Sequence, residues 1–313
     1  MPRKPRWFRG DKAYAEVQRT VDRQFLFKPD CAVMNIIGSA AARAKARYPV
    51  KLFWLDCNIN HKQTGRAPLS DDPEHLENMW RFDQLFNSLV ARGLNDYFGR
   101  EGGLYSSRNR SREAVDDMSL EQQLLYAVTN PVKDGIVERV AHWQGAGGVS
   151  SYRQLATGEV DRYTYVDRTA WHRAGGEKSR KRPEAFTKTI ELALDPLPGW
   201  EGMPDGRRQA HFRRLVRQWE HDAREERERE GRRAMGRRRL AKVDPRSRPM
   251  TGKPKTRAPL CHASSIEARN EYGQQQRVFL EQYYYASGMY LAGNRYVEFP
   301  RGSLRPPLIR VCA

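Results

Sequence analysis

The sequence has few cysteines and no long apolar run, and each of these absences excludes a class of protein. The four cysteines have no paired spacing, which argues against a disulfide framework and a cysteine-rich zinc module: they are Cys31, Cys57, Cys261 and Cys312. No run of about 18 apolar residues occurs, and no apolar segment follows the basic N-terminus as it would in a signal peptide. We therefore expect a protein of the reducing cytoplasm, associated with the nucleoid if it binds DNA, that neither crosses a membrane nor is secreted.

Acidic residues are too few to balance the basic ones. The 313-residue chain has 56 Lys and Arg against 38 Asp and Glu, which gives a formal net charge of +18 at pH 7. Such a surplus favours a polyanionic partner, either nucleic acid or an acidic membrane surface. The surplus is uneven, because residues 207–257 alone hold 19 Lys or Arg and 7 Asp or Glu. We expect that a folded part of the chain carries most of the core and that another part is strongly solvated.

Apolar periodicity predicts a mixed fold in the first half of the chain. Period-2 alternation and dense apolar runs predict strands at 14–20, at 50–60 (one strand, or two joined by a short turn) and at 104–108. Apolar residues at helical spacing predict helices over 33–48, over 73–98 and from Ser119, within a capping box, to Pro131. These helices provide too few crossovers for a parallel sheet, so we expect an α+β fold with an antiparallel sheet backed by helices.

Beyond residue 155 the pattern is dominated by charge. It predicts a strand at 187–194, a highly charged helix at 211–239 and a mainly helical C-terminal region that regains aromatic residues from 267 onward. We therefore expect five segments: a basic N-terminal arm (1–12), a mixed domain (13–155), a basic accessory region with the charged helix (156–243), a Pro and Arg-rich linker (244–260) and a small helical unit (261–313).

The first candidate for chemistry stands at the end of the apolar run. His61 and Gln63 are two residues apart, so in an extended chain their side chains point to one face while Lys62 points to the other. An imidazole nitrogen and an amide oxygen are neutral ligands that leave most of the charge on Mg²⁺ or Mn²⁺, which suits an ion that polarises a phosphate. A surface histidine beside a turn is the alternative interpretation of this short pattern.

The second candidate is a tyrosine and an asparagine on the third predicted helix. Tyr126 and Asn130 are four residues apart, so they share one helical face, while Leu120, Leu124 and Val128 supply a separate core stripe. A tyrosine hydroxyl, with a pKa near 10, can attack a phosphodiester if a metal stabilises the developing charge. The alternative is that Tyr126 only packs.

Together these stretches resemble a known family, the REP-associated tyrosine transposases, which are a branch of the HUH superfamily of single-stranded DNA nucleases and transposases. The resemblance covers about residues 13–155 and rests on five stretches in the family's order: YAEVQRTVDRQFLFKPD, KARYPVKLFWLDCNINHKQTG, GGLYSSRN, QLLYAVTNPVKDGIVERV and VSSYRQL. It implies a ferredoxin-like HUH nuclease domain.

The resemblance also implies roles for the two candidates. The family's Asn-His-hydrophobic-His strand motif corresponds to residues 60–63, so His61 and Gln63 would bind the metal. Tyr126 would be the nucleophile and Asn130 the third metal ligand. The implied reaction is cleavage of single-stranded DNA near a hairpin through a 5′-phosphotyrosine link, followed by strand transfer. The chain departs from the pattern at Gln63, where the family has His, at Lys62, where it has a hydrophobic residue, and at Val149, where it has Trp.

Basic residues would contact the DNA strand. We expect these contacts from Arg108, Lys133, Arg232, Arg233, Arg237, Arg238 and Arg239. The partner would be single-stranded or hairpin DNA without a membrane, and a homodimer remains open. Two other functions compete with the transposase: a nucleic-acid-binding protein that keeps the fold and has lost catalysis, which the Lys62 and Gln63 departures favour, and a basic RNA-binding protein.

Overall fold

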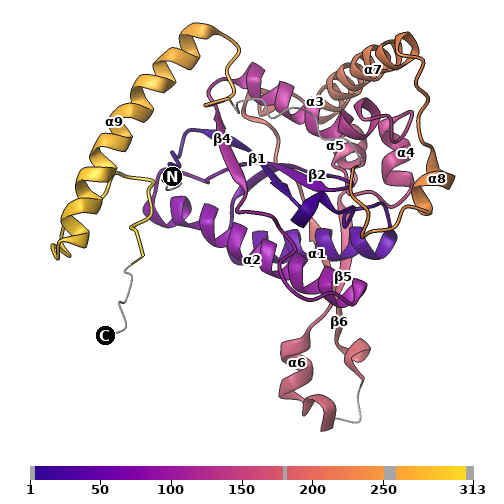
Figure 1. The fold of residues 1–313 in the computed structure, drawn as a ribbon, viewed down its shortest axis with the longest axis horizontal. Coiled ribbons are helices and arrows are strands. Elements are labelled where there is room, and N and C mark those ends of the chain that lie inside the picture. The colour runs from indigo at the N-terminus through magenta and orange to yellow at the C-terminus, as the bar shows by residue number, and fades with distance from the viewer. Residues whose placement is uncertain (1–3, 179–181, 250–258, 308–313) are drawn as a thin grey trace.

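Four antiparallel strands form the central sheet of the protein, with helices on both faces (Figure 1). The computed structural model describes residues 4–178, 182–249 and 259–307. The strands lie in the order β2-β3-β1-β4, where the bounds are β1 Ala13–Arg19, β2 Lys51–Asn58, β3 His61–Ala67 and β4 Arg110–Ala114. The predicted α+β class, an antiparallel sheet backed by helices, is confirmed, and the strand order is that of a ferredoxin-like fold.

Each face of the sheet has its own hydrophobic core. On one face, Leu52 and Leu55 pack with the apolar sides of α1 (Cys31–Arg47) and α2 (Pro73–Phe98). On the other, Ala15 and Trp54 pack with α3 (Asp117–Lys133). The two helices α1 and α2 end where predicted, before Pro49 and at Gly99, whose φ of 57° lies in the left-handed region that glycine tolerates.

The rest of the chain adds helices and a second, two-stranded sheet around this centre. The helices are α4 Val140–Gly145, α5 Tyr152–Thr157, α6 Arg168–Arg173, α7 Asp205–Arg229, α8 Arg237–Ala241 and α9 Ile266–Leu291. The second sheet pairs β5 (Asp161–Val166) with β6 (Thr187–Leu192) and lies against α1. Short 3₁₀ turns occupy Val21–Arg23, Gly176–Lys178, Pro183–Phe186 and Pro198–Trp200. Within the described ranges, no helix combines the length and apolar content that crossing a bilayer demands.

The first and last described segments of the chain contact each other and the centre. Phe8 is buried in the core beneath α2, and its amide donates to the carbonyl of Gly302 over 2.9 Å. Trp7 stacks on Phe279 of α9 with ring centroids 4.7 Å apart. The five predicted segments remain predictions, and most of the predicted linker, residues 250–258, lies outside the described residues.

A two-residue turn between β2 and β3 sets which side chains share a face. The apolar run is two strands, and Asn58 pairs directly with His61 across the turn formed by Ile59 and Asn60. His61 therefore opens β3 instead of closing the preceding strand. Because residues that pair across strands project to the same face, Asn58 lies on the face of His61, although counting along one continuous strand would separate them.

Two predicted elements have different bounds in the structure. Residues 104–108 form no strand beyond the single bridge of Tyr105 to Thr20, and the sheet edge is β4 instead. The pattern hides β4, because its arginines and glutamate give no apolar alternation. Helix α3 starts at Asp117, since the Asp116 carboxylate accepts from the Ser119 amide over 2.7 Å.

Two predicted helix ends are also wrong. Helix α3 runs through Pro131 to Lys133, where a proline in the last turn removes only one late hydrogen bond. The charged helix is α7, which starts at Asp205 and ends at Arg229; Gly231, with a φ of 64°, follows it, and a separate short helix, α8, begins at Arg237.

Lys62 points away from the face of His61 and is buried beneath α2. Its Nζ lies 4.1 Å from the ring centroid of Phe86. Burial lowers the pKa of Lys62 to about 8, against the attraction of Asp83 and Glu16. Those two carboxylates already have a better partner, because the fully buried Arg66 donates to Glu16 and, over 2.7 Å, to Asp83.

We predict that Gly65→Ala lowers the free energy of unfolding by about 1–3 kcal/mol, the usual cost of overpacking a core. Gly65 pairs with Trp54 across the sheet, and a methyl group there would come within 2.0 Å of the indole ring. Chemical denaturation measures the change. Gly202→Ala is the control, because no atom lies within 4 Å of its added methyl. Equal stability of both variants would contradict the packing of Trp54 over Gly65.

We predict that Lys62→Met raises the free energy of unfolding by on the order of 1 kcal/mol, because it removes a desolvated cation and keeps the packing on Phe86. Lys51→Met, which removes the exposed ion pair to Glu201, is the control and should change stability by less than about 0.5 kcal/mol. Denaturation curves of both variants provide the comparison. A clear loss of stability in Lys62→Met would mean that Glu16 and Asp83 need the charge of Lys62 in addition to that of Arg66.

Candidate active site

The three predicted metal ligands lie together, with two amide side chains next to the imidazole ring of the third. His61 opens β3, Gln63 follows on the same face, and Asn130 lies in the last turn of α3 above them. The His61 Nε2 atom is 2.9 Å from Asn130 Nδ2 and 3.4 Å from Gln63 Nε2. Both amide side chains are buried, whereas the imidazole is half-buried. The structure thus brings together residues that are 69 positions apart in the chain.

The imidazole ring is oriented by its neighbour. Asn60 Oδ1 lies 2.8 Å from His61 Nδ1, so it accepts the proton of that nitrogen and leaves the Nε2 lone pair toward the two amides. Burial, together with the positive Arg19, lowers the pKa of His61 to about 4. The ring is therefore neutral at neutral pH, as a metal ligand must be.

The donor set fits a hard divalent cation. A side-chain amide can present either its oxygen or its nitrogen, so Gln63 and Asn130 offer oxygens beside the His61 nitrogen. Such mixed neutral ligands suit Mg²⁺ or Mn²⁺ that also binds phosphate oxygens. Among the described residues, no group of three or more His, Cys, Asp and Glu side chains could hold a metal.

Asp56 is a carboxylate beside the candidate ligands, although parity along one continuous strand would place it on the opposite face. It pairs across the hairpin with Gln63 and is buried on the same face. Its Oδ1 accepts from Ser150 over 2.8 Å, whereas its Oδ2 has no hydrogen-bond partner among the described residues. Burial raises the pKa of Asp56 to about 7, although Ser150 and the Ser151 amide oppose the rise. Only knowledge of the turn would have placed it here.

Tyr126 lies one helical turn before Asn130 and reaches solvent. Its side chain is 38% exposed, unlike the buried apolar residues of the same helix, and Lys133 Nζ lies 5.5 Å from its ring centroid. Partial burial raises the pKa of Tyr126, and the negative Asp134 adds to the rise while the positive Arg19 opposes it. An accessible, protonated hydroxyl thus stands beside a cation.

Three arginines near the site were missed by sequence reasoning. Arg19 pairs with His61 across β1 and β3, and Arg110 of β4 pairs with Val17, two residues earlier on β1. Burial lowers the pKa of Arg19, and the positive Arg23 and Arg110 lower it further. None of the three forms an ion pair with a carboxylate in the described part of the chain. These arginines come close together through strand pairing, which could not be predicted from the sequence.

The predicted DNA contacts fall into two groups. Lys133 lies at Tyr126, and Arg108 stands before β4, where its guanidinium donates to the Lys4 carbonyl over 2.7 Å. The other group is exposed around α8: Arg232, Arg233, Arg238 and Arg239. The backbone between them meets the loop after α3, because the Met235 amide donates to the Gly135 carbonyl over 2.8 Å. The side chain of Arg237 lies outside the described residues.

Comparisons with known proteins find a similarity to solved structures only. No protein-family model matches the chain, and no curated protein matches it. Among solved structures, the chain is similar to one described as "Structure of the REP associates tyrosine transposase bound to a REP hairpin", with a TM-score of 0.39 and 16% sequence identity. The alignment covers 50% of this chain and 87% of that chain. A likeness of this degree leaves the family of the chain unassigned, so the case for function rests on the site.

Proposed function

We propose that the protein is a metal-dependent endonuclease and strand transferase, of the tyrosine transposase type, that acts on single-stranded DNA near hairpins. The observation that carries this proposal is the meeting of His61 with Asn130 at 2.9 Å and Gln63 at 3.4 Å, one helical turn from the exposed Tyr126. The exposed Tyr126 stands apart from the buried apolar stripe of α3, and Asn130, one helical turn later, contacts the neutral His61.

The chain's own residues supply the nucleophile and position the phosphate. Tyr126 Oη loses its proton and forms a bond to phosphorus as the bond from phosphorus to the 3′-oxygen breaks. The 3′-oxygen takes up a proton, which leaves a 5′-phosphotyrosine and a free 3′-OH. His61 Nε2 and the amide oxygens of Gln63 and Asn130 would hold Mg²⁺ or Mn²⁺, which polarises the scissile phosphate when bound. The positive Arg19 favours the phenolate form of Tyr126 during attack.

The same step run backward joins DNA strands. A second 3′-OH attacks the phosphorus of the phosphotyrosine and releases Tyr126, so the number of phosphodiester bonds is conserved and no external energy source is needed. Arg19, Arg23 and Arg110, without carboxylate partners in the described ranges, favour the anionic strand over a neutral substrate. The proposed setting is the nucleoid of the cytoplasm, with single-stranded or hairpin DNA as the partner.

We predict that wild-type protein, Mn²⁺ or Mg²⁺ and a pool of labelled hairpin DNA give a covalent protein–DNA adduct on a denaturing gel. Tyr126→Phe should abolish the adduct, because phenylalanine has no oxygen to attack phosphorus, and EDTA should abolish it by removing the ion. Tyr97→Phe is the matched control, since Tyr97 is also an exposed helical tyrosine but lies on α2. An adduct that persists in Tyr126→Phe would overturn the proposal.

A second candidate function is DNA binding by a catalytically impaired member of the same fold, and the observation that favours it is the amide at position 63. If Gln63 already serves as a ligand, we predict that Gln63→His retains adduct formation and lowers the Mn²⁺ concentration needed for half-maximal rate, because imidazole binds this ion more tightly. Gln63→Ala should raise that concentration by about 10–100-fold. Adduct formation by Gln63→His alone, with none by the wild type, would establish the second candidate instead.

A further inference from the structure

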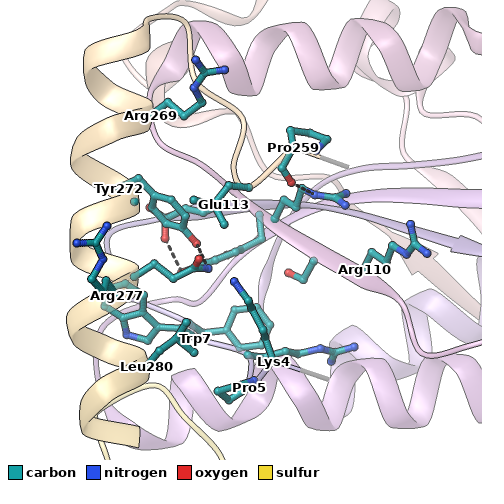
Figure 2. A pocket seen from close by; sticks show the side chains of 18 of the residues that line it. Lys4, Pro5, Trp7, Arg110, Glu113, Pro259, Arg269, Tyr272, Arg277 and Leu280 are labelled. Atoms are coloured by element: carbon teal, nitrogen blue, oxygen red, sulfur yellow. Dashed lines mark hydrogen bonds between the residues drawn. The ribbon is translucent and has the colours of Figure 1, made fainter. Parts of the chain in front are cut away.

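A large groove lies between the edge of the central sheet and helix α9 (Figure 2). Residues 4–8 of the N-terminal segment, strand β4 and one face of α9 line it, and we call it the β4–α9 groove. Its volume is about 1620 Å³. This exceeds the range of about 300–1,000 Å³ typical of pockets for small molecules, so the groove suits a segment of a polymer.

The groove has the charge of an anion-binding surface. Seven of its lining residues are Lys or Arg and two are Glu. Of the two acids, Glu113 is already neutralised by Arg9 and also accepts from Tyr14 over 3.3 Å, which leaves Glu281 as the opposing charge. Of the seven cations, Arg6 is paired with Asp83 over 3.1 Å. Arg269 and Arg277 of α9 are exposed and form no ion pair with any described residue. Because folding leaves these cations unpaired, an anionic partner is the complement.

The walls also carry aromatic and apolar side chains. Figure 2 shows Tyr272 and Leu280 coming from α9, with Trp7 of the N-terminal segment beside them. Trp7 is occupied by its stack on Phe279, whereas Tyr284, at the end of the same helical face, is 53% exposed. Unpaired bases stack on such rings, while a duplex presents mainly phosphates to a protein wall. The lining therefore favours a single strand over a duplex.

A line of arginines connects the groove to the candidate active site. Arg110, which lies on the side of the groove away from α9 in Figure 2, is on the same face of β4 as Arg112, and it pairs with Val17, two residues before Arg19 on β1. Arg112 also lines the groove, and its Nε donates to the Pro259 carbonyl over 2.6 Å. Arg19 pairs with His61 across β1 and β3, so basic residues extend from the candidate active site to the groove.

We propose that the β4–α9 groove binds single-stranded DNA that continues from the phosphate beside Tyr126. Phosphates would follow Arg110, Arg112, Arg269 and Arg277, and a base would stack on Tyr284. The continuity with Tyr126 rests on the proposed function, whereas binding in the groove stands on the charges and rings of the groove itself.

The first test measures binding without chemistry, in a Tyr126→Phe background. Arg269→Gln/Arg277→Gln removes two exposed cations of the groove, and Arg81→Gln/Arg92→Gln, on the exposed side of α2, is the matched control. We predict about tenfold weaker binding of a labelled single strand by the groove variant, and a salt slope smaller by about 1.4 for two lost phosphate contacts. Binding and slope equal to those of the control would overturn the proposal.

The second test locates the strand and identifies its class. A photoreactive benzoylphenylalanine replaces Tyr284 in one protein and Tyr97 of α2 in another, each mixed with a single strand, its duplex, RNA of the same sequence or polyglutamate. Crosslinking of the single DNA strand at position 284 and not at 97 is expected. Preferred crosslinking of duplex, RNA or polyglutamate at 284 would overturn the assignment of the occupant.

The two proposals fail separately. If Tyr126 forms the adduct and the groove variant binds DNA like the control, the proposed groove site is wrong and the proposed strand transfer stands. Loss of binding in the groove variant with no adduct from the wild type would overturn the chemistry and keep the groove as a site for a DNA strand.

Discussion

The two-residue turn between β2 and β3 is the constraint on which the rest of the site depends. It pairs Asn58 with His61, so Asp56 and Gln63 also project toward α3 while Lys62 projects toward α2. A register slip of one residue would exchange the two faces, burying the imidazole beneath α2 and leaving a lysine amine among the candidate ligands. The buried Arg66 opposes such a slip, because its hydrogen bonds to Glu16 of β1 and Asp83 of α2 exist only in the present register.

The second requirement of the site is that α3 continues through its proline. Pro131 usually signals the end of a helix, yet Asn130 keeps helical geometry and its amide reaches His61. The last turn is supported from outside, since the buried Arg227 of α7 donates to the Val132 carbonyl over 2.6 Å. The charged helix α7 thus contributes to the site through position: it holds the end of α3 over the sheet, and the chain after it brings the basic residues around α8 to the following loop.

The sequence allowed prediction of the elements that have an apolar periodicity or a clear stop signal. Helix α2 is predicted to the residue, because its apolar stripe is long and Gly99 ends it. Strand β4 is not predicted, because residues 110–114 have no apolar face and are held as a strand by pairing with β1. The residues of the site differ in the same way. The spacing of His61 and Gln63 along one strand can be seen in the sequence. Arg19, Arg110 and Asp56 come close to the site only because the strands pair.

Two sets of described arginines differ in how the fold neutralises their charge, and the contrast supports the proposed binding of an anionic strand. Arg66 is buried between carboxylates, so its charge is neutralised in the fold and serves stability. Arg19 and Arg110 lie on the opposite face, where burial lowers the pKa of Arg19 and the positive Arg23 and Arg110 lower it further. Folding retains this unfavourable energy, and a phosphate placed among them would relieve it. An anion that binds only the folded state stabilises that state, so under the proposed function this repulsion would favour binding of the DNA strand.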